Sequence, residues 1–300
     1  MKVLLIVNPA AGQQSARQRL AGIIRVFNEY DVRCSVYITK GPGDATEFLK
    51  KTDFDFDRVV CVGGDGTLHE TVEGRRLSGR DYAVGYIPAG TTNDFASSLG
   101  LSSDMLTAAA DSLKGQICAL DTGMFNGRSF VYTATCGAFA RTSYMTPQDM
   151  KNALGHSAYI VSGLMDLPHI RPMRLKVSAD EAEFSGEYIF CSITNSLSVG
   201  GILKLDSSRV CMNDGKFELM LIRNPVSLPQ WTRLLSSLRV QDIPNEMVSF
   251  VSANRFHIDA EENIEWTLDG EAGEHGRVFD IMVQEQALRM ALARKADCCL

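Results

Sequence analysis

The sequence is short of the features that mark a membrane-spanning, secreted or nucleic-acid-binding protein. No apolar run approaches the roughly 20 residues that span a bilayer. The first apolar run, Val3–Val7, ends at Asn8-Pro9 and is too short for the core of a secretory signal. Lys and Arg number 30 against 36 Asp and Glu, a net charge of −6, which argues against nucleic acid as a partner and against a polybasic membrane tether. We therefore expect a cytoplasmic protein that meets membranes only peripherally.

Paired metal-binding cysteines are also missing. The 8 cysteines form no Cys-x-x-Cys pair with a histidine partner, and we expect them to be reduced and structural. The terminal Cys298-Cys299 is not a prenylation signal, because Asp297 stands where the lipidated cysteine would be. Internal repeats and low-complexity segments are absent as well.

One stretch, from Val59 to Glu70, organises what is present. Val59–Val62 is short and β-branched, which predicts a buried parallel strand. The glycines of Gly63–Gly66 permit tight turns and leave amide groups free to surround an anion, and a helical pattern begins at Thr67. Asp65 inside this turn would repel a bare phosphate, so it suggests a bridging Mg²⁺. Taken alone, the same four residues are also compatible with an ordinary turn.

The first hundred residues alternate strand-like and helix-like segments. This order predicts a doubly wound parallel sheet with helices on both faces, whose ligands bind at the carboxyl ends of the strands. The predicted strands are Val3–Val7, Arg33–Ile38, Val59–Val62 and Tyr82–Ile87, and the predicted helices are Ser15–Asn28, Asp44–Lys51 and one from Thr67. Four loops rich in Gly, Asn or Thr follow these strands and should converge: Asn8–Gly12, Thr39–Gly41, Gly63–Thr67 and Pro88–Phe95.

Beyond about residue 120 the pattern changes to short alternating segments, which are typical of antiparallel strands. Asn126-Gly127 predicts a hairpin between Asp121–Phe125 and Arg128–Thr135, and helical spacing returns at Met150–Leu167. Further predicted strands are Met173–Ser178, Glu187–Thr194, Phe217–Ile222, Met247–Asp259, Ile264–Leu268 and Val278–Val283. We therefore predict an α/β domain over residues 1–120 and a second, β-rich domain over residues 121–285, with residues 286–300 packing back on the first.

Two further motifs, Gly90–Ala96 and Asp269-Gly270-Glu271, give the sequence a family resemblance. Together with Gly63–Thr67 they resemble the diacylglycerol kinase catalytic family in its compact bacterial form. NAD kinases and phosphofructokinases share only the Gly-Gly-Asp-Gly element. The match is collinear and also includes Asn8-Pro9 with Gly12, Thr39 with Gly43–Ala45, Asp121, Asn195 with Gly200-Gly201, and Asp214-Gly215. It implies that a nucleotide-binding α/β domain faces a β-sandwich-like domain across a cleft.

The resemblance also implies roles for individual residues. Glu271 would be the general base toward a lipid hydroxyl, and Asp65 and Asp121 would hold the catalytic Mg²⁺. Asp214, with the backbone carbonyls of Cys211 and Lys216, would form a second, structural metal site. The residues that would line the ATP site are Asn8, Thr39, Gly64, Asp65, Gly66, Thr67, Leu68, His69, Glu70 and Thr91.

Simpler roles are open for several of these residues. By local pattern alone, Asp214 and Glu271 lie in hairpin turns, Asp121 could cap a turn, and Asp269 would orient the turn that carries Glu271. We expect His69 to pack in the first turn of its helix, and Trp231 and Trp266 to lie in the core.

The chain also departs from the family pattern. Gln13-Gln14-Ser15 follow Gly12 where the family often carries a cation, so that Arg17 is the first one. Ser208 and Val210 replace a Pro and an Ala before the late Asp-Gly.

These observations predict an ATP- and Mg²⁺-dependent kinase that phosphorylates diacylglycerol or a similar membrane lipid. Alternatives are a kinase for another acceptor (a sphingoid base, phosphatidylglycerol or NAD) and a non-catalytic nucleotide- or lipid-binding regulator. The predicted partners are ATP and a lipid at a membrane surface, with a homodimer left open.

Overall fold

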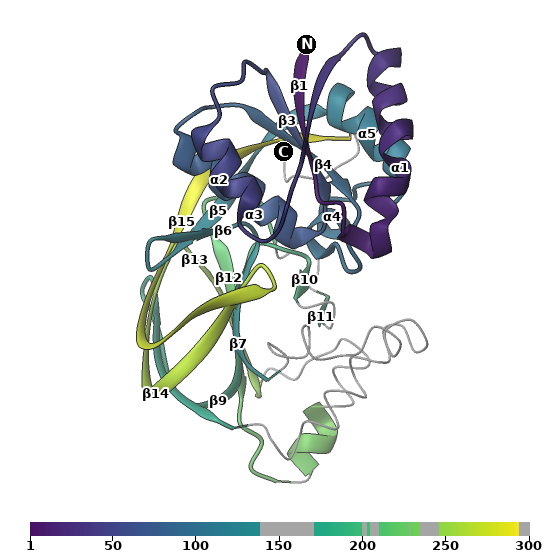
Figure 1. Ribbon diagram of the computed structural model, residues 1–300. Helices are drawn as coiled ribbons and strands as arrows, with labels where there is room; N and C mark the ends of the chain where they lie inside the picture. The colour runs from purple at the N-terminus through teal and green to yellow at the C-terminus, as the bar shows by residue number, and fades with distance from the viewer. Residues whose placement is uncertain (139–170, 200–202, 205–209, 228, 235–245, 294–300) are drawn as a thin grey trace. The chain divides into compact units, whose positions relative to one another are not determined.

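The computed structural model describes residues 1–138, 171–199, 203–204, 210–227, 229–234 and 246–293, in which helices and strands are mixed and strands predominate. The chain forms two compact units, one made of Met1–Thr122 with Glu285–Leu300 and the other of Gly123–Gln284. It leaves the first unit within strand β5 (Gln116–Phe125) and returns within the long strand β15 (Glu271–Leu292) (Figure 1). Among the described residues, no helix is long and apolar enough to cross a bilayer.

The sheet of the first unit is parallel, with the strand order β15-β4-β3-β1-β2. Its strands besides the end of β15 are β1 (Lys2–Val7), β2 (Arg33–Ile38), β3 (Arg58–Gly63) and β4 (Ala83–Pro88). All but the first residue of β1 and of β3 are buried, as are all residues of β4, because helices cover both faces. The predicted parallel pairing of the first four strands is confirmed.

Helices α1 (Ala11–Glu29) and α5 (Met105–Lys114) lie on one side of this sheet, and α2 (Asp44–Lys51) and α3 (Asp65–Ser78) lie on the other (Figure 1). Ile23 and Phe27 of α1 join a buried cluster with Leu5 of β1 and Ala109 of α5. The short helix α4 (Asp94–Ser98) follows β4. Two helices begin earlier than predicted, α1 at Ala11 and α3 at Asp65.

The sheet of the second unit is antiparallel, with the order β13-β12-β9-β7-β14-β15, while β8 pairs with β9 and β14, and β6 pairs with β5. Strands β10 (Ser198–Val199) and β11 (Leu203–Lys204) form a separate pair. The remaining strands are β6 (Arg128–Phe130), β7 (Thr133–Gly137), β8 (Met173–Ala179), β9 (Ala182–Thr194), β12 (Phe217–Arg223), β13 (Val248–Ala253) and β14 (Arg255–Leu268).

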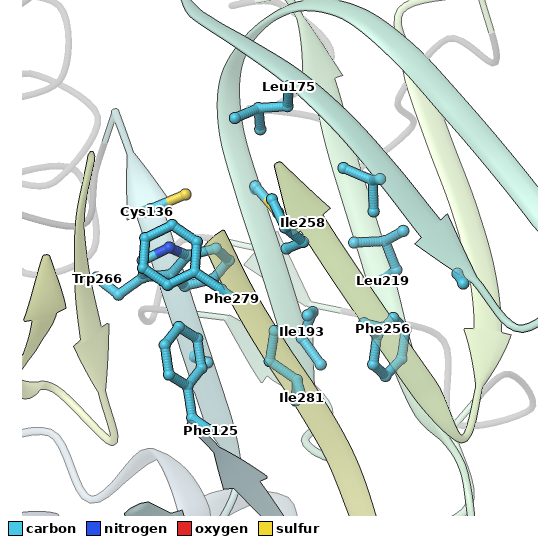
Figure 2. Packing of buried hydrophobic residues seen from close by; sticks show 14 of the residues in the cluster. Phe125, Cys136, Leu175, Ile193, Leu219, Phe256, Ile258, Trp266, Phe279 and Ile281 are labelled. Atoms are coloured by element: carbon cyan, nitrogen blue, oxygen red, sulfur yellow. The ribbon is translucent and has the colours of Figure 1, made fainter. Parts of the chain in front are cut away.

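Aromatic side chains form the centre of the second unit's core. The ring of Trp266 lies 5.0 Å from that of Phe125 and 5.6 Å from that of Phe279, and its side chain is almost fully buried (Figure 2). Trp231 packs against a smaller cluster that contains Met220 and Leu234. The predicted core position is confirmed for Trp266, whereas Trp231 is only partly buried.

The cysteines of the described residues are free thiols, as predicted. Cys61, Cys118, Cys136 and Cys191 are buried, and Cys34 is half-buried. Burial raises the pKa of Cys61 to about 12, so this thiol stays protonated and unreactive.

The hairpin at Asn126-Gly127 is confirmed, since both residues have positive φ (47° and 89°) and join β5 to β6. The predicted strand Arg128–Thr135 is wrong as a single element, because the strand is interrupted between Phe130 and Thr133. The backbone N–H groups of Val131, Tyr132 and Thr133 donate to the carboxylate of Asp269.

A second strand prediction, Met247–Asp259, is also wrong as a single element. It breaks at Asn254, because the carboxylate of Asp180 accepts the backbone N–H groups of Asn254 and Arg255. The predicted segments Ile264–Leu268 and Val278–Val283 are instead parts of β14 and β15. The predicted helical segment Met150–Leu167 lies outside the described residues.

Arg75 of α3 fastens the returning strand β15 to the first unit. Its guanidinium donates to the carbonyl oxygens of Tyr82 (2.8 Å) and Ala287 (2.7 Å) and forms an ion pair with Asp81 (2.6 Å). Asp81 also pairs with Arg289 of β15. One side chain therefore joins α3, the segment before β4 and the returning strand β15.

We expect Arg75→Met to lower the free energy of unfolding by about 2–4 kcal/mol, because the two carbonyls and the carboxylate lose a charged donor. The matched control is Arg76→Met, which removes a surface pair with Glu73 and should cost about 1 kcal/mol or less. Urea unfolding of both variants makes the comparison, and equal losses would contradict the role given to Arg75.

Candidate active site

Glycine backbones bring three loops of the first unit into contact at the carboxyl ends of β1, β3 and β4. A Cβ on Gly90 would stand 2.6 Å from the Cα of Gly64, closer than side chains allow. Gly12 has φ 55°, and a Cβ there would stand 2.1 Å from the carbonyl oxygen of Ala89. Both approaches require glycine. The predicted convergence of these loops is confirmed.

The second feature of this edge is the beginning of α3. Its N-cap residue, Gly64, is extended (φ −91°, ψ −174°) and, as a glycine, has no side chain to cap the helix. The first amide groups of a helix have no partner within the helix, and the helix dipole favours negative charge there. The N-terminus of α3 and the adjoining glycine loops therefore form a surface suited to a phosphate group.

Asn8 joins the loop after β1 to this helix. Its side-chain amide donates to the hydroxyl of Thr67 (3.0 Å), and its side-chain oxygen accepts the backbone N–H of Ala10 (3.0 Å). Its backbone N–H donates to the carbonyl of Val62 at the end of β3. Asn8 and Thr67, both predicted site residues, are thus in direct contact.

Asp65 lies half-buried in the first turn of α3. Its carboxylate accepts the backbone N–H of Asp94 (3.0 Å) and lies 3.4 Å from the hydroxyl of Tyr86. Burial, reinforced by the charges of Asp65 and Asp94, raises the pKa of Tyr86 well above its usual value, so this hydroxyl stays a neutral donor. Asp65 therefore couples α3 to the start of α4.

Two further side chains at this edge, Asn93 and Tyr86, support the loops although the sequence predicted no role for them. Asn93 closes its loop by accepting the N–H of Gly90 (2.9 Å) and donating to the carbonyl of the same residue (2.8 Å). Its φ of 50° is left-handed, which asparagine tolerates better than most residues. The Gly90–Ala96 motif could have indicated this role, whereas nothing distinguishes Tyr86 in the sequence from an ordinary strand residue.

Thr39 and Glu70 hold the fourth loop, which follows β2, against the rest of the first unit. Thr39 is buried, and its backbone N–H donates to the carbonyl of Val7 (2.9 Å). The carboxylate of Glu70 accepts the backbone N–H groups of Gly43 (2.7 Å) and Ala45 (3.1 Å) at the start of α2. Glu70 therefore acts on the loop between Thr39 and α2.

The other predicted nucleotide-site residues differ in exposure. Gly66 is half-buried and Thr91 is exposed. Leu68 and His69 are buried, as expected of residues that pack in the first turns of α3.

Asp121, the second predicted Mg²⁺ residue, lies on β5 and contacts β15. Its side chain is fully buried on β5, and its carboxylate accepts the backbone N–H of Gln286 (2.7 Å) on β15. Gln286 has a left-handed φ of 51°. Among the described residues, no cluster of three His, Cys, Asp or Glu side chains has the arrangement that would hold a metal ion.

Glu271 is exposed in the second unit, beside the turn that joins β14 to β15. The turn residues Asp269 and Gly270 both have positive φ (50° and 82°). Asp269 is buried, and its carboxylate accepts the N–H groups of Val131 (2.6 Å), Tyr132 (2.9 Å) and Thr133 (3.1 Å). The expectation that Asp269 orients this turn is confirmed.

The remaining predicted metal residues lie in the loop before β12. Asp214 and Lys216 are exposed, and Asp214 accepts the backbone N–H of Lys216 (3.1 Å). The thiol of Cys211 contacts the side-chain oxygen of Asn213 (3.3 Å). Glu218 follows on β12 and is buried; burial first, then the charge of Asp214, raises the pKa of Glu218 to about 8.

We expect Gly90→Ala to separate the loops at Gly64 and Gly90, because the added methyl group overlaps the Cα of Gly64. Overpacking of this kind costs about 1–3 kcal/mol, and we expect the affinity for MgATP to fall about tenfold or more. The control is Gly276→Ala on β15 in the second unit, where a Cβ would meet the ring of Phe279 at an ordinary contact distance of 3.6 Å. Isothermal titration with MgATP tests both variants, and unchanged affinity in Gly90→Ala would contradict the role of this contact.

The chain resembles known proteins in sequence and in structure. Residues 2–125 match the diacylglycerol kinase catalytic domain model. The chain is 34% identical to a diacylglycerol kinase of Bacillus subtilis over 90% of its length and 89% of the relative's. It is 27% identical to a diacylglycerol kinase of Staphylococcus saprophyticus, over 90% and 88%. The crystal structure of a diacylglycerol kinase from Bacillus anthracis shares the fold, with a TM-score of 0.77, 22% identity and 98% of each chain covered.

The matched residues 2–125 include the convergent loops and the whole Gly63–Glu70 stretch. The similarity to the diacylglycerol kinase of Bacillus subtilis covers 90% of the chain and therefore includes parts of both units. The prediction of an ATP-dependent lipid kinase is confirmed at the level of the family. The chain belongs to the diacylglycerol kinase catalytic family.

Proposed function

We propose that this protein transfers the γ-phosphate of ATP to a hydroxyl group of diacylglycerol or a similar membrane lipid. The observation that carries the proposal is the contact of the Gly12, Gly64 and Gly90 backbones around the start of α3, whose N-cap residue is a glycine. Phosphoryl transfer requires positioning and charge neutralisation more than covalent chemistry, and such a surface supplies both. In this proposal the parallel-sheet unit binds ATP, and the β-rich unit receives the lipid in a sandwich-like domain.

ATP would lie along the loops described above, with Asn8 and Thr67 fixing the edge of β1 against α3. Thr39, held to β1 through the carbonyl of Val7, and the exposed Thr91 would border the site on either side. Gly64 and Gly66 would offer backbone amides, while Leu68, His69 and Glu70 would shape the site from behind, Glu70 by fixing the loop before α2.

Asp65 and Asp121 are the proposed Mg²⁺ residues. Mg²⁺ in kinases keeps several waters and takes only one or two protein carboxylates, so two separate acids fit it. When bound, the ion neutralises charge on the β- and γ-phosphates. The backbone N–H groups of Asp94 and Gln286 donate to the two carboxylates and fix their orientation.

Glu271 is the proposed general base. It stands at the end of a turn whose backbone is fixed by the buried carboxylate of Asp269, while its own side chain is exposed. An alcohol loses its proton only as the phosphoryl group is transferred, so the base needs hydrogen-bond reach rather than a large pKa shift. The exposed carboxylate of Glu271, on a turn fixed by Asp269, is accessible to such a hydroxyl group.

The proposal includes a second, structural metal site formed by Asp214 and the carbonyls of Cys211 and Lys216. The buried carboxylate of Glu218, four residues along the chain, fits a positive ion in this region. Because the acceptor is a membrane lipid, we also propose a reversible, peripheral encounter with the cytoplasmic face of the membrane. A homodimer remains a prediction.

The test is transfer of labelled phosphate from ATP to a panel of lipids in mixed micelles, with NAD included. We expect diacylglycerol to be the preferred acceptor and Glu271→Gln to lower kcat by about 10²–10⁴ while ATP affinity is unchanged. Glu262→Gln, which alters an exposed acid of β14, is the control and should retain wild-type kcat.

Phosphorylation of NAD or of a sphingoid base in preference to diacylglycerol would overturn the proposed acceptor. Transfer to none of them would favour a regulator that binds nucleotide without turnover. Loss of ATP binding in Glu271→Gln, with kcat near wild type, would place Glu271 in the nucleotide site instead.

A further inference from the structure

Glu218 is the one buried carboxylate of the described second unit that lacks a hydrogen-bond partner on one oxygen. Its side chain is 1% exposed, Oε1 accepts the hydroxyl of Ser252 at 3.3 Å, and Oε2 has no partner. By contrast, the buried carboxylate of Asp269 accepts three backbone N–H groups. Each such exception requires a physical explanation, and an absent ion is one of them.

Neither protonation state of Glu218 satisfies the site by itself. An ionised carboxylate with a single hydrogen bond of this length would leave a buried charge uncompensated. If the carboxyl group were protonated, Oε2 would still have no hydrogen-bond partner, whether it carried the proton or was the carbonyl oxygen. A buried water could complete the hydrogen bonds, but only a cation compensates the charge.

The strands beside Glu218 hold the loop of the proposed structural metal. Glu218 pairs with Thr194 on β9 and with Ser252 on β13. The next residue after Thr194, Asn195, donates to the carbonyl of Met212 (3.3 Å), and Asn254, just beyond β13, donates to the carbonyl of Gly215 (2.9 Å). The loop from Met212 to Gly215 is therefore fixed from both sides at the end of β12 where Glu218 lies.

Charge points to the same arrangement. Asp214 is near enough for its charge to act on Glu218, and the two acids repel each other when both are ionised. Divalent cations such as Mg²⁺ and Ca²⁺ prefer carboxylate and carbonyl oxygens, and Asp214 and Glu218 are carboxylates of one short segment. A cation converts the repulsion into a shared attraction.

We propose that Glu218 is a further ligand of the divalent cation held by the Asp214 loop, so that two carboxylates and backbone carbonyls form the site. This inference rests on the structural metal site proposed above. It gives the buried Glu218 carboxylate a binding role in the second unit, separate from phosphate transfer.

The test is thermal unfolding of the full chain without nucleotide, in EDTA and in a concentration series of Mg²⁺ and of Ca²⁺, with Mn²⁺ binding measured by electron paramagnetic resonance. For the wild type we expect a saturable rise in Tm of about 5 °C. Glu218→Gln should weaken cation binding at least tenfold and leave Tm in EDTA equal or higher, because a buried charge is removed. Glu218→Met, an apolar replacement of similar length, should behave in the same way.

Two further variants distinguish the possible failures. Glu183→Gln alters an exposed acid on β9 and should keep the full cation response, whereas Asp214→Asn should lose it. Wild-type affinity in both Glu218 variants, with loss in Asp214→Asn, would overturn the role of Glu218 and leave the Asp214 site standing. Absence of any cation response in the wild type would overturn both.

Discussion

The close approach of the Gly64 and Gly90 backbones is the constraint on which the candidate site depends. No larger residue could stand at Gly90, because a Cβ there would lie 2.6 Å from the Cα of Gly64. The contact places the turn before α3 directly against the loop that follows β4. The left-handed Gly12 brings the loop after β1 against Ala89 in the same way. A parallel sheet alone would bring these loops near one another, but the glycines leave room for a ligand's charged oxygens beside the backbone amides.

Carboxylates that accept backbone N–H groups fix the loops around this framework. Glu70 orders the start of α2, Asp121 joins β5 to the returning β15, and Asp269 ties the turn before Glu271 to the segment after β6. Charge-assisted bonds of this kind are short and directional, so they hold irregular backbone where no ladder can form. Acidic residues that lie in sequence motifs thus also act as structural supports. Glu218 differs from them, because one of its oxygens accepts only the hydroxyl of Ser252 and the other has no hydrogen-bond partner.

The sequence predicts the first unit well, because β1, β3 and β4 are buried along almost their whole length and a glycine-containing loop follows each predicted strand. The predicted bounds of β2 and α2 agree with the structure to the residue. Local pattern is less informative in the second unit, where distant carboxylates decide the strand ends: Asp269 interrupts Arg128–Thr135, and Asp180 ends β13. The support given by Tyr86 to Asp65 was equally invisible, since a tyrosine within a buried strand looks like core. Contacts between residues far apart in sequence leave no periodic signal.

The central claim is that ATP phosphates and Mg²⁺ bind at the joined loops of the first unit. Hydrogen–deuterium exchange of the full chain, with and without Mg²⁺ and a non-hydrolysable ATP analogue, measures this directly. We predict slower exchange at the amides of residues 8–12, 63–67 and 88–95, with β8 and β13 of the second unit unchanged. Protection confined to the second unit, or unchanged exchange at all three loops under saturating nucleotide, would contradict it.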